Sequence, residues 1–118
     1  MLRMLAMIVS LVQTAPASKV DIVRVAGCLR ETTPGTWMVV DATDPVPSNA
    51  NAPPRNEIPA TLPAGKNQFK LIGVSEFDLP LHRDHGVIIK GLYIKAQPVS
   101  RLNITSVNTI APSCGGAK

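Results

Sequence analysis

The alternation of apolar and polar residues predicts β-strands along most of the chain. In the stretch VRVAGCLRE, residues 23–31, the odd-numbered positions from 23 to 29 hold Val, Val, Gly and Leu, and the even-numbered ones include Arg24 and Cys28. A period of two places successive side chains on opposite faces of a strand. Apolar stretches predict four more strands, at residues 37–42, 67–74, 86–96 and 101–110. The pattern therefore predicts an all-β fold.

Turn residues separate these strands. Pro34-Gly35 predicts a type II turn after the first strand. A single short helical turn is expected at residues 75–78, between the third and fourth strands, with Ser75 as its cap and Pro80 as its stop.

Glycines inside two of the strands predict bends. Gly27 and Gly91 occupy the same place in the shared pattern V-x-[VI]-x-G, where glycine indicates a bulge or a close backbone approach. In the last strand the apolar residues change parity, which predicts a bulge near Thr105 and Ser106.

Residues 45–64 interrupt the β pattern. They contain six of the eleven prolines, and proline removes a backbone donor and fixes φ. We expect a disordered loop here that neither pairs as a strand nor continues a helix.

The N-terminal residues resemble a secretory signal peptide. Arg3 precedes an apolar run at residues 4–12, and Ala15-Pro16-Ala17 offers small residues for cleavage. The run is shorter than the roughly 20 residues that span a bilayer. We expect a signal peptide at residues 1–17, a mature domain at 18–118 without a transmembrane segment, and a periplasmic or secreted location. The alternative is an N-terminal strand or helix packed on the core.

Five strands with a helical turn between the third and fourth match the element order of an OB-fold, a five-stranded Greek-key barrel. Residues 20–112 contain Gly27, Trp37, Asp41, the pattern Val87-x-Ile89-x-Gly91 and the pattern Leu102-x-Ile104-x-x-Val107. With these residues the chain resembles small exported bacterial OB-fold proteins, among them the BOF family. The resemblance implies a periplasmic or extracellular protein with a ligand-binding or stress-related role, and it carries no catalytic residues.

The chain has two cysteines, Cys28 and Cys114. In an exported protein two cysteines predict a single disulfide. Cys28 is expected to point away from the core, so the bridge would fasten the C-terminal tail across the first strand. Two free thiols are the alternative if the chain is not exported.

His82 and His85 are the weak candidates for metal ligands. A metal site usually has three or four protein ligands, and no third histidine exists. We therefore expect a polar turn without a metal or other cofactor. No serine lies in a G-x-S-x-G motif, and a Cys28–histidine pair would need a free thiol, so we expect no enzyme.

The composition limits the ligands. Aromatic residues make up 3% of the chain, and its net charge of +4 is scattered, which disfavours nucleic acid as a ligand. We expect a monomeric binding module for an envelope ligand, bound on the outer face of the first three strands by Arg24 and Lys70. Trp37 belongs to this face or to the core, and the core is favoured. The alternative function is a structural protein whose proline-rich loop binds a partner protein.

Overall fold

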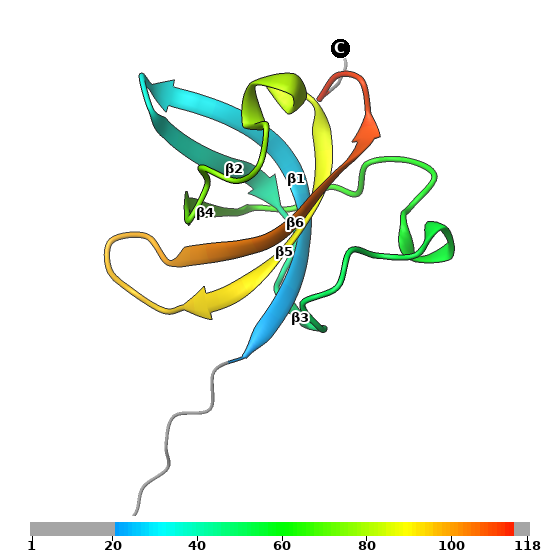
Figure 1. Cartoon of the computed structure of the whole chain (residues 1–118), viewed down its shortest axis with the longest axis horizontal. Coiled ribbons are helices and arrows are strands. Elements are labelled where there is room, and N and C mark those ends of the chain that lie inside the picture. Colours follow the sequence, from blue (N-terminus) through cyan, green and yellow to red (C-terminus); the bar gives the residue numbers. More distant parts are fainter. Residues whose placement is uncertain (1–20, 115–118) are drawn as a thin grey trace, which may run out of the picture.

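The computed structural model describes residues 21–114. The predicted signal peptide, residues 1–17, lies outside the described residues. The described part is mostly β-structure, which confirms the predicted class, and none of its helices is long and apolar enough to cross a membrane. Its elements are β1 (Ile22–Thr33), β2 (Thr36–Ala42), β3 (Val46–Pro47), η1 (Arg55–Glu57), β4 (Asn67–Ile72), η2 (Leu79–His82), β5 (Gly86–Ile94) and β6 (Arg101–Ala111), where η marks a 3₁₀ turn (Figure 1).

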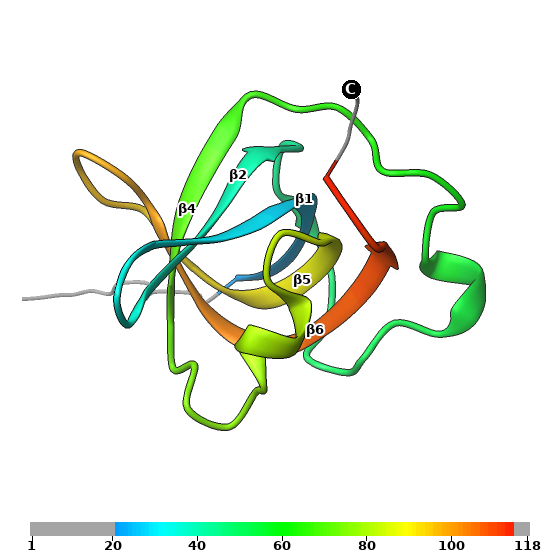
Figure 2. The same ribbon diagram turned by 90° about the horizontal axis from the view of Figure 1, so that it is seen from above.

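Five of the strands form a closed ring. β1 pairs with β2, β2 with β4, β4 with β6, β6 with β5, and β5 returns to β1. The pairing of β4 with β6 is parallel, and the other four pairings in the ring are antiparallel. Seen from above, the strands surround a common interior (Figure 2). The five predicted strands all belong to this ring.

The inward-facing side chains form the hydrophobic core. Val23, Val25 and Leu29 of β1 are each at most 4% exposed. Trp37 lies in the same core with 6% of its surface exposed, so the favoured inward orientation is confirmed. A core with few aromatic residues gains packing volume from this large side chain. The other buried members are Val39, Ala42, Phe69, Leu71, Leu79, Val87, Ile89, Leu102 and Ile104.

β1 changes its pairing partner directly after Gly27. It pairs with β5 from Ile22 to Cys28 and with β2 from Cys28 onward. A Cβ at Gly27 would lie 2.7 Å from the carbonyl oxygen of Val40 and 2.9 Å from the Cα of Ala42. A side chain would therefore push β2 away from β1. The predicted close approach at Gly27 is confirmed.

The pairing of β5 with β6 changes register at Gly91. Lys90 faces Ser106 and Gly91 faces Ile104, so Thr105 is the extra residue of a β-bulge. A Cβ at Gly91 would lie 2.9 Å from the Cα of Ile104. The bulge and the role of Gly91 are both as predicted.

The turn between β1 and β2 also follows the prediction. Thr33 pairs with Thr36 across Pro34-Gly35. Gly35 has a φ of 83°, as the third residue of a type II turn requires.

The short helical turn between β4 and β5 lies later in the chain than predicted. It was expected at residues 75–78 and is found as η2 at Leu79–His82, with Pro80 inside its first turn. The fixed φ of proline suits a first helical turn. A residue at this position has no hydrogen-bond acceptor for its N–H within the helix, so proline loses no hydrogen bond there. Pro80 therefore begins the turn instead of ending it.

The proline-rich segment, residues 45–64, contains a sixth strand. Its residues Val46 and Pro47 form β3, antiparallel to Val23 and Arg24 of β1. β3 is an edge strand, the last one at its side of the sheet. Proline is tolerated there because the N–H that it lacks would not be needed to bond a further strand. The prediction that the segment cannot pair as a strand is therefore wrong for these two residues.

The whole segment, called the strap below (residues 45–64), leaves the ring on one side and arches beside β1 and β5 (Figures 1 and 2). The Ser48 N–H donates a hydrogen bond of 2.8 Å to the β1 backbone. The Glu57 carboxylate lies 3.4 Å from the Lys90 ammonium on β5. The Leu62 side chain covers the start of β5. These contacts differ from the disordered loop that the composition predicts.

The two cysteines form one disulfide, as predicted, with their Cα atoms 5.4 Å apart. Gly86 of β5 pairs with both Cys28 on β1 and Ala111 on β6. The bridge therefore crosses the start of β5 and ties β1 to the chain after β6. Cys28 lies outside the core cluster, but it is only 2% exposed, because the end of the strap and Cys114 cover it. The prediction of a cysteine on an open strand surface is corrected in this respect.

Replacing both cysteines, Cys28→Ser with Cys114→Ser, should destabilise the fold. The bridge closes a loop of sequence separation 86, for which the chain-entropy model gives an upper figure of roughly 4–5 kcal/mol. We expect a lower urea midpoint, followed by the fluorescence of Trp37. Reduced wild type should unfold at the same midpoint as the variant. Equal midpoints for the oxidised wild type and the variant would contradict the stabilising role of the bridge.

Candidate functional site

A row of side chains crosses four strands on the outer surface of the ring. Arg30 on β1 faces Met38 on β2, and Met38 faces Lys70 on β4. Lys70 in turn faces Arg101 on β6. Directly paired residues point to the same face of a sheet, so these four residues, called the basic row below, are neighbours. With strands about 4.8 Å apart, the row is about 14 Å long.

The side chains of the basic row point outward because their chain neighbours point into the core. Lys70 lies between the buried Phe69 and Leu71. Arg101 precedes the buried Leu102 in the same way. Lys70 is partly exposed and Arg101 is exposed. The row is therefore accessible from outside the ring.

The three cations of the row differ in their partners. Arg30 is 2.8 Å from the Asp84 carboxylate, and both side chains are about half exposed. Such an exposed pair contributes little to stability. Within residues 21–114, neither Lys70 nor Arg101 forms an ion pair. The row thus carries two cations that an anionic ligand could reach.

The loop between β5 and β6 lies at one end of the row. The Lys70 N–H donates to the Ser100 carbonyl at 3.0 Å, and the Ser100 hydroxyl accepts from the Ala96 N–H at 3.2 Å. This loop and the start of β4 enclose an open pocket of about 540 Å³. Phe69 and Tyr93 also line it, with their rings edge to face and 6.0 Å apart. The loop is therefore held in place beside the basic row, with a pocket next to it.

Two ion pairs hold the β1–β2 hairpin at the other end of the row. One is Arg30–Asp84, and the other joins Arg83 to Glu31 at 2.6 Å. Glu31 also accepts a hydrogen bond of 3.0 Å from the Gly35 N–H. That hydrogen bond is the largest single cause that lowers the pKa of Glu31; burial opposes the shift, and the Arg83 guanidinium lowers the pKa further. The two pairs tie the hairpin to the segment between η2 and β5.

The structure separates the residues that the sequence grouped into one binding face. Arg24 pairs with Val46 of β3 and with Lys90 of β5, whereas Lys70 pairs with Met38 of β2. Arg24 therefore lies beneath the strap, and the register does not bring it beside Lys70.

Trp37, the third predicted ligand-binding residue, lies in the core. The Arg83 guanidinium lies 5.5 Å from the centre of its ring. Arg30 and Arg101 take part in the row, and sequence reasoning missed both. Their outward parity was visible in the sequence, but the register that makes them neighbours was not.

The two histidines meet at a threonine. The Nδ1 atoms of His82 and His85 lie 2.7 and 3.1 Å from the Thr109 hydroxyl. In the described part of the chain, no three His, Cys, Asp or Glu residues form a group suited to a metal. That His82 and His85 bind no metal tightly stays a prediction.

The alternative of a Cys28 nucleophile activated by a histidine is excluded, because Cys28 is bridged.

No family model matches the chain, and no curated protein or solved structure is similar enough to count as a match.

His82 should make the stability of the protein depend on pH. Burial lowers the pKa of His82, and the neighbouring His85 adds to this shift, while Asp78 opposes it. The unfolded chain therefore binds a proton more readily, and stability falls as the pH drops through about 6.5. The His82→Gln variant has no titrating side chain at position 82. Its urea midpoint should therefore fall less than that of the wild type between about pH 7.5 and pH 5.5. Equal decreases in the two proteins would refute this role of His82.

Proposed function

We propose that this chain is an exported, non-enzymatic OB-like binding module whose ligand lies along the basic row. The OB-fold is supported by the order of the ring. Numbered within the ring alone, the strands run 1-2-3-5-4 and close on strand 1, with strands 3 and 5 parallel. A five-stranded Greek-key barrel of this kind binds oligonucleotides and oligosaccharides on one face and the adjoining loops.

Two independent features support export. The N-terminal residues have the layout of a signal peptide. The Cys28–Cys114 disulfide suits an oxidising compartment such as the periplasm or the cell exterior. An envelope or extracellular ligand follows from this location.

The ligand we propose is an acidic oligosaccharide. The observation that carries this choice is the adjacent pair of Lys70 and Arg101, which form no ion pair within residues 21–114. A row about 14 Å long suits an extended chain with repeated carboxylates. The basic row contains no aromatic side chain on which a nucleic-acid base could stack. Acidic sugars are therefore favoured over single-stranded nucleic acid.

The alternative function, in which the strap binds a partner protein, has less support. The strap pairs with β1 through β3, and its Glu57 contacts Lys90. Pro53 within it is buried. The part of the strap that contacts β1 and β5 is less accessible to a partner protein.

Binding to an oligogalacturonate, measured by titration calorimetry, tests the proposal. Lys70→Gln with Arg101→Gln should weaken binding at least about tenfold, because each lost charged hydrogen bond costs roughly 1.5–3 kcal/mol. Arg24→Gln with Arg55→Gln removes the same charge on the strap side of the ring, away from the row, and should change affinity little. A neutral galacto-oligosaccharide should bind much more weakly. Equal losses in the two double variants, or no binding of the acidic oligomer, would overturn the proposal.

A further inference from the structure

A second, smaller pocket lies between the strap and the outer face of β1 and β5. Its volume is about 270 Å³. Its charged lining residues are Arg24 of β1 and Glu57 of the strap. The apolar side chains that line it are Ala26, Val46, Pro59, Pro63 and Ile88. The pocket therefore combines apolar walls with two charges of opposite sign.

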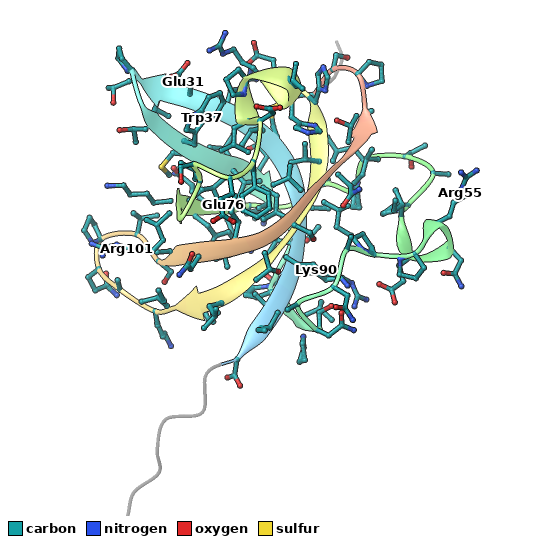
Figure 3. All side chains as sticks on the ribbon, viewed as in Figure 1. Glu31, Trp37, Arg55, Glu76, Lys90 and Arg101 are labelled. Atoms are coloured by element: carbon teal, nitrogen blue, oxygen red, sulfur yellow. A yellow bond between two sulfur atoms is a disulfide. The ribbon has the colours of Figure 1, made fainter. Side chains whose placement is uncertain are left out.

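The charge of Glu57 is already matched by a buried lysine. Lys90 is 0% exposed, and its ammonium lies 3.4 Å from a Glu57 carboxylate oxygen and 3.4 Å from the Asn49 side-chain oxygen. Figure 3 shows Lys90 between β5 and the strap that carries Arg55. A buried charge is tolerated when it is paired. Lys90 thus neutralises Glu57 and holds the strap against the sheet.

Arg24 has no such partner. It faces Lys90 directly across the β1–β5 pairing, and like charges in this position destabilise a sheet. Within residues 21–114, Arg24 forms neither an ion pair nor a side-chain hydrogen bond. The one carboxylate beside these two adjacent cations is paired with Lys90, and a second carboxylate would balance Arg24. The planar guanidinium of arginine is suited to bind it through two parallel hydrogen bonds.

We propose that this pocket binds a small monocarboxylate with a short apolar body. Arg24 binds the carboxylate, and the apolar walls formed by the strap and β1 surround the body. A pocket of about 270 Å³ suits a small ligand. An oligosaccharide is too large for it. The site is separate from the basic row and goes beyond the proposed function.

Benzoate and 4-methylvalerate are suitable probes, with benzamide and 4-methylvaleramide as their neutral counterparts. Titrations of the ¹⁵N-labelled full chain, followed by amide chemical shifts, should show saturable binding of the acids, with shifts centred on Ala26, Val46 and Ile88. Each amide should bind at least about tenfold more weakly than its acid, because it cannot form the charged pair with Arg24. This comparison uses the unaltered protein and does not depend on the folding of a variant.

Substitutions assign the site to its residues. Arg24→Gln should weaken benzoate binding at least about tenfold, and Arg24→Lys, which keeps the charge, should weaken it less. Lys95→Gln removes an exposed cation that lines neither this pocket nor the basic row, and it should have no effect. No saturable binding, equal affinities for acid and amide, or an Arg24→Gln variant that binds as well as the wild type would overturn the proposal, whatever the outcome for the basic row.

Discussion

The fold depends on the ability of one strand, β1, to pair with two others. β1 leaves β5 and joins β2 at Cys28, directly after Gly27. Because no Cβ fits at Gly27, any other residue would open the ring between β1 and β2 and expose the core to water. The disulfide begins at Cys28, so the covalent tie acts next to the position where β1 and β2 approach each other most closely at Gly27. Closing the ring also removes most of the free edges that strands in an open sheet present to other chains, and the edge left at the start of β1 is paired with β3.

Closure gives the ring one interior and an outer surface that the strap divides into two parts. On the open part, the cations of the basic row are solvated and need no partner from the protein. On the covered part, Lys90 is removed from water, and its two polar contacts, Glu57 and Asn49, both come from the strap. The strap therefore does more than join β2 to β4. It makes a buried ammonium tolerable, and in doing so it forms the pocket at Arg24.

Local sequence rules account for the strands, the type II turn, the bulge at Thr105 and the disulfide. Each of these follows from residues close in the chain or, for Cys28 and Cys114, from the lack of any other partner. The basic row could not be predicted in the same way. Arg30 and Arg101 belong to one row only because β1, β2, β4 and β6 pair in a particular register. Alternation fixes the face of a residue, but long-range pairing fixes its neighbours, and this is why Arg24 was wrongly grouped with Lys70.

The strap shows where composition misleads. Prolines disfavour strands and helices, but they also restrict the unfolded chain, so ordering a proline-rich segment loses less conformational entropy than ordering other loops of equal length. A few contacts are then enough to hold it: the two residues of β3, the Ser48 hydrogen bond and the Glu57–Lys90 pair. Their partners lie in β1 and β5, at Ile22, Val23, Arg24 and Lys90, and no pattern within residues 45–64 reveals them. Six prolines therefore do not establish that a segment is disordered when a neighbouring sheet offers an edge strand and a buried cation.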